Sequence, residues 1–241
     1  MSYQNIDLEK YTPFEHLLAL IVGEEKTGKS WLASTAPKPI LFLDTDSRAA
    51  SIAGRPGVYA RSFREAPYPM QPTVAPDILD SLTQLEKSLD LSEMGFDVPK
   101  GTVIKTLVLD SISTIARAAM QYDLYTTSGI RREISIAGKF KVSIPANWDA
   151  WNAEIDFVEK LVLRAAALPV HLICILHETE EKAAGSTPEK PTFTGKITVY
   201  PERYARLLKY FNEVWRVKLT PKPNPKNPML QVPTVQTRPD Y

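Results

Sequence analysis

The segment 23–30 has the residue types and the spacing that bind the phosphates of a nucleoside triphosphate. It reads Gly-Glu-Glu-Lys-Thr-Gly-Lys-Ser and fits the pattern Gly-x4-Gly-Lys-Ser/Thr in full. Glycines let backbone amides wrap closely around a phosphate, and Gly23 and Gly28 supply them. Lys29 would place a cation between the β- and γ-phosphates, and the Ser30 hydroxyl would be a ligand of Mg²⁺. The predicted ligands are ATP and Mg²⁺, and the predicted nucleotide-binding residues are Gly23, Glu24, Glu25, Lys26, Thr27, Gly28, Lys29, Ser30 and Trp31.

Two carboxylates inside this segment are unusual, because they would repel the phosphates. We expect Glu24 and Glu25 to point outward, with Lys26 offsetting part of their charge. We also expect Lys29 to face the surface as a ligand and not to pack in the core.

A second candidate ligand of Mg²⁺, the carboxylate of Asp110, follows the apolar segment 107–109. An apolar run that ends on an aspartate usually marks only the end of a strand. In a chain that also has a phosphate-binding loop, the same pattern predicts that Asp110 joins Ser30 in the metal shell. The next residue is Ser111 and not a glutamate, so the carboxylate that activates water is expected on another strand.

The elements that must position these residues alternate between strands and helices. Continuous apolar runs predict buried parallel strands, and spacings of three and four predict helices. We predict strands at 17–22, 40–43, 57–60, 103–109, 170–176, 213–220 and 230–235, helices at 28–35, 77–91, 112–125, 147–168 and 201–210, and loops at 66–76, 126–146 and 179–196. This alternation indicates an α/β fold with a mainly parallel sheet flanked by helices. The strand ends at Gly23, Asp44, Asp110 and His177 should then meet at one edge.

Composition favours one globular domain over the whole chain, 1–241. Of the 241 residues, 44% are hydrophobic and 24% charged, and the formal net charge of +1 gives no global positive field. The single cysteine, Cys174, excludes an internal disulfide and a cysteine-based zinc site. No apolar run approaches the length of a membrane span, so we expect a cytoplasmic protein without a membrane partner.

Three strand ends resemble those of RecA-type ATPases. The segments 41–46 (LFLDTD), 107–112 (LVLDSI) and 173–178 (ICILHE) match the strand with the catalytic carboxylate, the Walker B strand and the strand with the γ-phosphate sensor. The resemblance implies a RecA-like P-loop NTPase core with Lys29, Asp46 and His177 as catalytic residues. The family usually has glutamate where this chain has Asp46. A strand-end turn for Asp46, an ordinary strand-end histidine for His177 and a base role for Glu178 remain alternatives.

The chain most resembles phage and prophage AAA-like, RecA-related ATPases that act as single-strand annealing proteins. Matching features are Pro-Lys-Pro at 37–39, a Trp-containing helix before Leu-Pro-Val-His within 148–171, His-Glu at 177–178 and Gln-Thr-Arg-Pro-Asp at 236–240. The resemblance implies a Mg²⁺-dependent ATPase, slow without DNA, in a phage-infected or prophage-bearing bacterial cell. It also implies a homo-oligomeric ring or filament, with single-stranded DNA and a single-strand-binding protein as candidate partners.

DNA contact in RecA-type proteins comes from two loops, which correspond here to 126–146 and 179–196. Their candidate DNA-binding residues are Arg131, Arg132, Lys139, Lys141, Lys182, Lys190, Phe193 and Lys196. Cations with an aromatic side chain suit single strands, although basic loop residues are often simply solvated. A P-loop switch or assembly ATPase without DNA binding is the main alternative, and a small-molecule kinase is a third. Arg216 and Lys218 are possible substitutes for the basic residues that the family sends into a neighbour's site.

Overall fold

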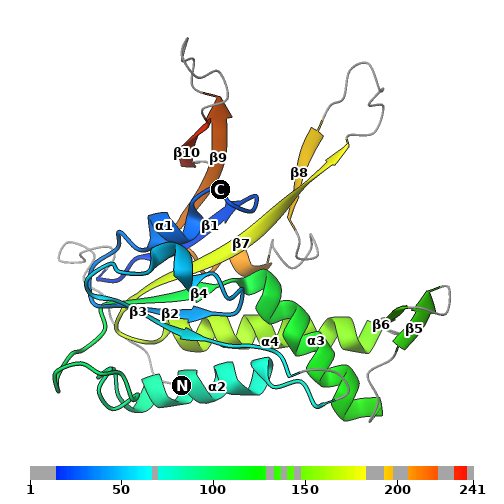
Figure 1. Ribbon diagram of the computed structural model, residues 1–241, viewed down its shortest axis with the longest axis horizontal. Helices are drawn as coiled ribbons and strands as arrows, with labels where there is room; N and C mark the ends of the chain where they lie inside the picture. Colours follow the sequence, from blue (N-terminus) through cyan, green and yellow to red (C-terminus); the bar gives the residue numbers. More distant parts are fainter. Residues whose placement is uncertain are drawn as a thin grey trace, which may run out of the picture.

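The computed structural model describes residues 15–66, 70–128, 133–136, 140–143, 148–182, 193–197, 206–221 and 231–237. A sheet forms its middle layer (Figure 1). Helix α1 (Lys29–Ala33) and the 3₁₀ helix η1 (Ala49–Ile52) pack on one face, and three longer helices cover the other. These are α2 (Val74–Lys87), α3 (Ile112–Ser128) and α4 (Trp148–Ala166).

The sheet has six parallel strands in the order β9-β1-β7-β4-β2-β3. Their bounds are β1 (Leu18–Gly23), β2 (Ile40–Asp44), β3 (Val58–Ser62), β4 (Thr106–Asp110), β7 (His171–Lys182) and β9 (Glu213–Pro221). The antiparallel strand β10 (Gln231–Thr237) extends the sheet beyond β9. This arrangement confirms the predicted α/β fold with a mainly parallel sheet flanked by helices.

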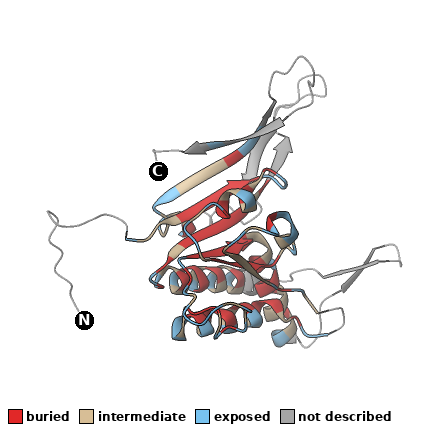
Figure 2. Cartoon of the chain, turned by 60° about the vertical axis from the view of Figure 1, so that its left-hand side comes forward, coloured by how far each residue is buried: buried red, intermediate tan, exposed pale blue. Residues whose placement is uncertain are grey.

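Both faces of the central strands are buried, as their continuous apolar runs predict. In β1, Leu20 and Val22 pack with the three long helices, whereas Ala19 and Ile21 pack with the side of α1. Figure 2 shows buried residues along the strands and on the inner faces of the helices. The buried core therefore fixes the positions of β1, β4 and β7, and with them the backbone of Gly23, Asp110 and His177.

Helix α2 begins at Val74, three residues before the predicted start, and includes Pro76. Proline is tolerated in the first turn of a helix, where its missing N–H has no partner to lose. Strand β4 is shorter than the predicted 103–109, because Val103 makes only an isolated bridge with Asp90. Neither difference moves Asp110 from the end of its strand.

The two segments predicted as loops, 126–146 and 179–196, contain strands, so that prediction is wrong. Helix α3 continues to Ser128, and β5 (Glu133–Ile136) pairs antiparallel with β6 (Phe140–Ser143). Strand β7 continues to Lys182 and pairs with β8 (Phe193–Ile197). Polar and apolar residues alternate in both strands of the first hairpin. This alternation is typical of a strand, and it is a stronger signal than the charged residues that led to the loop prediction.

Part of the predicted helix 201–210 lies outside the described residues, and within it 206–208 are helical. The two closing strands are confirmed as β9 and β10. None of the helices in the described ranges is long and apolar enough to cross a membrane.

Candidate nucleotide-binding site

The phosphate-binding loop connects β1 to α1, as the sequence predicts. Gly28 immediately precedes α1 and has φ of 92°, a conformation that side chains with a Cβ rarely adopt. Gly23 has a different constraint, because a Cβ there would lie 2.3 Å from the backbone oxygen of Val217 in β9. The first glycine is thus required by the neighbouring strand, and the last by the shape of the loop.

Lys29 is buried and not surface-facing, contrary to the prediction, with 5% of the residue exposed. Its Nζ donates to the carbonyl oxygens of Gly23, at 2.9 Å, and Glu24, at 2.5 Å. Burial lowers the pKa of Lys29 to about 8, Arg48 adds to this effect, and Asp110 opposes it. The loop therefore holds an ammonium group at its centre through bonds that a phosphate can replace.

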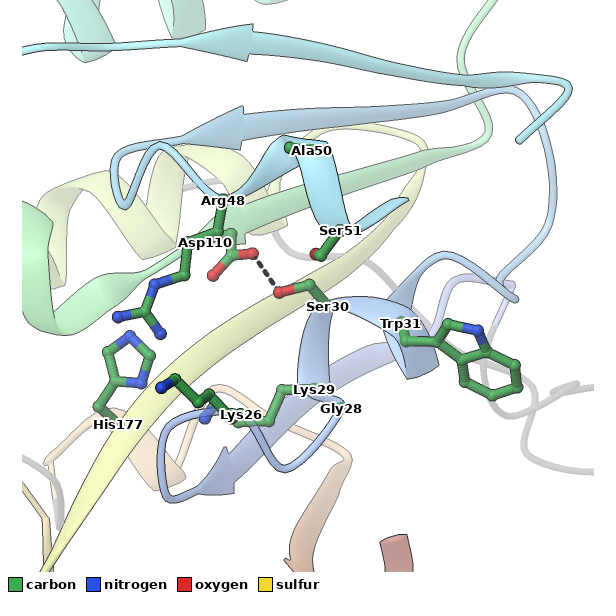
Figure 3. A pocket seen from close by; sticks show the side chains of 10 residues that line it. All are labelled: Lys26, Gly28, Lys29, Ser30, Trp31, Arg48, Ala50, Ser51, Asp110 and His177. Atoms are coloured by element: carbon green, nitrogen blue, oxygen red, sulfur yellow. Dashed lines mark hydrogen bonds between the residues drawn. The ribbon is translucent and has the colours of Figure 1, made fainter. Parts of the chain in front are cut away.

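Ser30 and Asp110 meet at the centre of the site, as predicted for a metal shell. The Ser30 hydroxyl donates to Asp110 Oδ2 at 2.6 Å (Figure 3). Burial raises the pKa of Asp110 to about 6, with the Ser30 hydrogen bond acting in the opposite direction.

This pair of hard oxygen ligands fits Mg²⁺, which binds few protein groups and retains water and phosphate ligands. Within the described residues, no group of three His, Cys, Asp or Glu side chains could hold a metal without such help. Ser30 would bind the ion, and Asp110 would hold it directly or through water.

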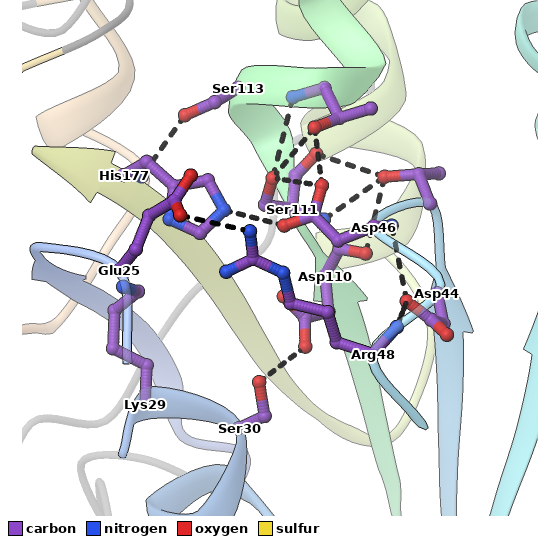
Figure 4. Close-up of polar contacts among 12 residues, drawn as sticks. Glu25, Lys29, Ser30, Asp44, Asp46, Arg48, Asp110, Ser111, Ser113 and His177 are labelled. Atoms are coloured by element: carbon purple, nitrogen blue, oxygen red, sulfur yellow. Dashed lines mark hydrogen bonds and ion pairs between the residues drawn. The ribbon is translucent and has the colours of Figure 1, made fainter. Parts of the chain in front are cut away.

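Asp46 lies at the same edge of the sheet, where three side chains contact its carboxylate (Figure 4). Its Oδ2 is 2.5 Å from His177 Nε2, while Oδ1 accepts hydrogen bonds from Thr114 and, at 3.2 Å, from Ser111. Burial alone would raise the pKa of Asp46, but these hydrogen bonds, that of His177 first, outweigh it and lower the pKa to about 2. Asp46 is therefore a charged and oriented carboxylate.

The strand-end turn that was the alternative for Asp46 belongs to Asp44. The Asp44 carboxylate accepts the backbone N–H groups of Asp46, Arg48 and Ala49 at 3.0–3.2 Å. It also accepts the Ser62 hydroxyl at 3.0 Å. Asp44 thus fixes the loop after β2 and leaves the Asp46 side chain available to the site.

His177 and Glu178 are neighbours in β7 but point to opposite faces of the sheet. His177 pairs in register with Gly23, its backbone N–H donates to Ser113 Oγ at 3.0 Å, and its ring faces Asp46. Glu178 is buried and forms an ion pair with Arg216, whose Nε donates to it at 2.9 Å. The alternative base and a candidate interface cation therefore bind each other, away from the site.

The sequence reasoning missed Arg48. Its guanidinium forms an ion pair with Glu25 at 3.1 Å, so this carboxylate reaches across the site to Arg48, where we had expected an offset from Lys26. The signal available was its position two residues after Asp46, in a loop that follows a strand next to the Walker B strand.

A pocket of about 500 Å³ lies between the phosphate-binding loop, Asp110 and His177, and its volume is typical of small-ligand sites. It is lined by Lys26, Gly28, Lys29, Ser30, Trp31, Arg48, Ala50, Ser51, Asp110 and His177 (Figure 3). At one end the indole of Trp31 is 56% exposed, and the guanidinium of Arg55 lies 4.7 Å from its centroid. An exposed aromatic ring at the mouth of a pocket suits a nucleobase.

The predicted DNA-binding residues are only partly described. Arg131, Arg132, Lys139 and Lys190 lie outside the described residues, and Lys141 belongs to β6. Lys182, Phe193 and Lys196 lie on strands of the β7–β8 hairpin, which continues directly from His177. The structure thus places three of these candidates on a hairpin, where the prediction was a loop.

The fold and this site define a P-loop domain of the ATPase class, a class that binds nucleotides together with Mg²⁺. The chain belongs to the AAA domain family, whose family model matches residues 15–234. No curated protein matches the chain.

Two archaeal crystal structures are similar to the chain at low identity. The flagellar accessory protein FlaH from Methanocaldococcus jannaschii is 12% identical and covers 92% of this chain and 77% of its own, with a TM-score of 0.40. A KaiC-like protein from Pyrococcus horikoshii OT3 is 13% identical and covers 91% and 77%, with a TM-score of 0.41.

Proposed function

We propose that the chain binds ATP with Mg²⁺ and hydrolyses it, with Lys29, Asp46 and His177 as catalytic residues. The observation that carries this proposal is the convergence of three groups on one pocket. These are the lysine of a complete phosphate-binding loop, the Ser30–Asp110 pair and His177, whose ring contacts the charged Asp46 carboxylate.

Lys29 would exchange its carbonyl partners for β- and γ-phosphate oxygens, and Ser30 and Asp110 would hold Mg²⁺ against the same phosphates. Bound Mg²⁺ neutralises the charge that develops on the transferred phosphoryl group. The loop amides and the start of α1 supply further donors to the phosphates.

Asp46 would orient the attacking water and accept its proton as the bond from the γ-phosphorus to the bridging oxygen breaks and ADP leaves. For this the carboxylate must be charged, and its low pKa keeps it so near neutral pH. His177 would exchange its contact with Asp46 for the γ-phosphate, and this exchange would release Asp46 Oδ2 toward water.

The experiment is to measure ATP and ADP affinity and phosphate release with and without Mg²⁺. Lys29→Met keeps the length of the buried chain and removes its charge, so it separates loss of binding from loss of fold. Nucleotide affinity equal to that of the wild type in Lys29→Met would reject the site.

We propose further that this ATPase is a homo-oligomer, a ring or a filament, that acts on single-stranded DNA in phage-type recombination. The cell would then be a phage-infected or prophage-bearing bacterium, with a single-strand-binding protein as a candidate partner. The proposal is supported by the resemblance in the sequence and by the continuity of β7, which joins His177 to Lys182 and, through the hairpin, to Phe193 and Lys196. A γ-phosphate that moves His177 would also act on this hairpin.

A salt titration separates this proposal from an ATPase without DNA binding. Single-stranded DNA is titrated at several salt concentrations with ADP and with a non-hydrolysable ATP analogue. We expect tighter binding with the analogue, by about 5- to 150-fold for ordinary coupling energies. His177→Ala should remove most of this gain, and neutralising Lys182, Lys190 and Lys196 together should flatten the salt slope. Equal affinities in both nucleotide states and an unchanged slope would favour the ATPase without DNA.

A further inference from the structure

We propose that Arg48 is a catalytic cation of the chain's own site, which contacts the terminal phosphate of the triphosphate, and that Glu25 holds it aside until that phosphate binds. This inference rests on the proposed binding of ATP. It concerns a residue outside the phosphate-binding loop and outside the Asp46–His177 pair.

The loop after β2 carries both Arg48, which lines the pocket, and Asp46, which contacts the pocket residue His177. Asp44 Oδ1 accepts the N–H of Asp46 at 3.1 Å and that of Arg48 at 3.2 Å. Between them Ser47 has φ of 55°, in the left-handed region that reverses the chain direction. The turn therefore fixes the start of both side chains, and Figure 4 shows the guanidinium of Arg48 reaching the carboxylate of Glu25.

The charges around the pocket favour the binding of an anion between Arg48 and Lys29. Arg48 and Lys29 line the same pocket, so two cations face one cavity and repel each other. A phosphate bound between two cations turns this repulsion into attraction. Arg48 is also suited to the task, because a guanidinium binds phosphate oxygens through two parallel hydrogen bonds.

The contact with Glu25 is of the kind that a phosphate can replace. The two side chains are 40% and 59% exposed, and exposed ion pairs contribute little to stability. Glu25 belongs to the phosphate-binding loop, where an unpaired carboxylate would repel the ligand. Its pairing with Arg48 offsets this repulsion in the nucleotide-free protein and also competes with the phosphate for the arginine.

The position of Arg216 also favours a cation that comes from the same chain as the bound nucleotide. That arginine was a candidate to reach a neighbouring subunit, but it is held by Glu178 on the other face of the sheet. Arg48 needs no neighbour, because it lines the pocket of its own chain.

The test compares affinities for a non-hydrolysable ATP analogue and for ADP, both with Mg²⁺, in wild type, Arg48→Ala, Arg48→Lys and Glu25→Gln. Arg48→Ala should bind the analogue at least about tenfold more weakly and ADP within about twofold. Arg48→Lys should keep part of the preference, and Glu25→Gln should increase the preference for the analogue. The control Arg117→Ala removes an equal charge from an exposed position on α3 and should change neither affinity.

A mixing experiment decides whether Arg48 acts in its own chain. Arg48→Ala and Lys29→Met are combined, so that one variant has an intact phosphate-binding loop and the other an intact Arg48. Action in cis predicts no recovery of hydrolysis in the mixture, whereas recovery would move Arg48 to a neighbour's site and overturn the proposal.

Two outcomes distinguish this inference from the proposed function. If the wild type binds neither nucleotide, the proposed function itself fails. If the wild type prefers the triphosphate and Arg48→Ala preserves that preference, or loses both nucleotides equally, Arg48 is only a structural partner of Glu25.

Discussion

The site has two ends, built on neighbouring strands, and each treats its carboxylate differently. At the metal end Asp110 is buried, with a hydroxyl donor from Ser30, and its pKa rises to about 6. At the hydrolytic end Asp46 is also largely enclosed, but three side-chain donors lower its pKa to about 2. Burial pushes both pKa values upward, and the charges of Asp46 and Asp44 push that of Asp110 further, whereas three donors lower that of Asp46.

The contrast indicates how the work is divided between the two carboxylates. The buried Asp110 carboxylate accepts one side-chain hydrogen bond, from Ser30, and a divalent cation would add a partner of opposite charge. A carboxylate with three donors is already stabilised as an anion and needs only to be uncovered. Under the proposed function, the metal end would be completed by a ligand, whereas the hydrolytic end would be completed by a movement of His177.

Asp46→Asn should have the largest effect and tests the hydrolytic end. Loss of a general base should slow hydrolysis by about 10²- to 10⁴-fold, while ATP affinity changes by less than about threefold. Single-turnover phosphate release and equilibrium binding measure the two quantities. Hydrolysis at the wild-type rate would remove Asp46 from the mechanism.

Asp110→Asn should have a smaller effect and tests the metal end. The amide keeps an oxygen for Ser30 but removes the charge from the metal shell. We expect hydrolysis to fall by about 10- to 100-fold, with recovery at higher Mg²⁺ concentration. Titration of Mg²⁺ at saturating ATP is the measurement, and a loss that excess Mg²⁺ does not restore would place Asp110 outside the metal shell.

The same two variants should change the stability of the metal-free protein in opposite directions. The ordinary pKa of an aspartate is about 3.9, so a folded value of about 6 means that charging Asp110 at neutral pH costs stability. Asp110→Asn should therefore raise the free energy of unfolding at pH 7 by about 1–2 kcal/mol, and this gain should disappear as the pH falls from about 6 to 4.

Asp46 has the opposite sign. Its folded pKa of about 2 lies below the ordinary value, so its charge contributes stability above pH 4 that is lost as the pH falls toward 2. Asp46→Asn should lower the free energy of unfolding by a similar amount at pH 7. Denaturant unfolding of both variants in the presence of a chelator measures these changes. Changes in the free energy of unfolding with the same sign in both variants would contradict the distinction between the two ends.

The architecture and the meeting of Ser30 with Asp110 could be predicted from the sequence, because each follows from local patterns. The loop pattern of 23–30 and the apolar run before Asp110 are visible without tertiary information, and parallel strands bring their ends to one edge. The burial of Lys29 could not be predicted, because it depends on how the loop folds over its own lysine.

The hydrolytic end is harder to predict, because its side chains come from three distant segments, around residues 46, 111–114 and 177. Asp46 and His177 were found through a resemblance, but Thr114 and Ser111 reach Asp46 from the start of α3 and the residue before it. Arg48 was missed for the same reason, since only the turn around Asp44 shows where it points. The two hairpins were missed because charge was weighed above alternation.

Glu178→Gln should have the smallest effect on hydrolysis and tests the separation between the site and the opposite face of the sheet. Glu178 follows His177 directly, so the sequence alone left it as an alternative base. In the structure its carboxylate is buried against Arg216, and His177 faces the pocket. We expect hydrolysis within about threefold of the wild type, because no step of the proposed reaction uses Glu178.

The stability of Glu178→Gln should fall modestly, since the amide leaves the charge of Arg216 without its partner. Arg216→Gln in the same background should recover part of the loss. The measurements are single-turnover hydrolysis and denaturant unfolding of the single and double variants. If Glu178→Gln slows hydrolysis more than Asp46→Asn does, the base lies on β7, and the hydrolytic end of the site must be assigned to Glu178 in place of Asp46.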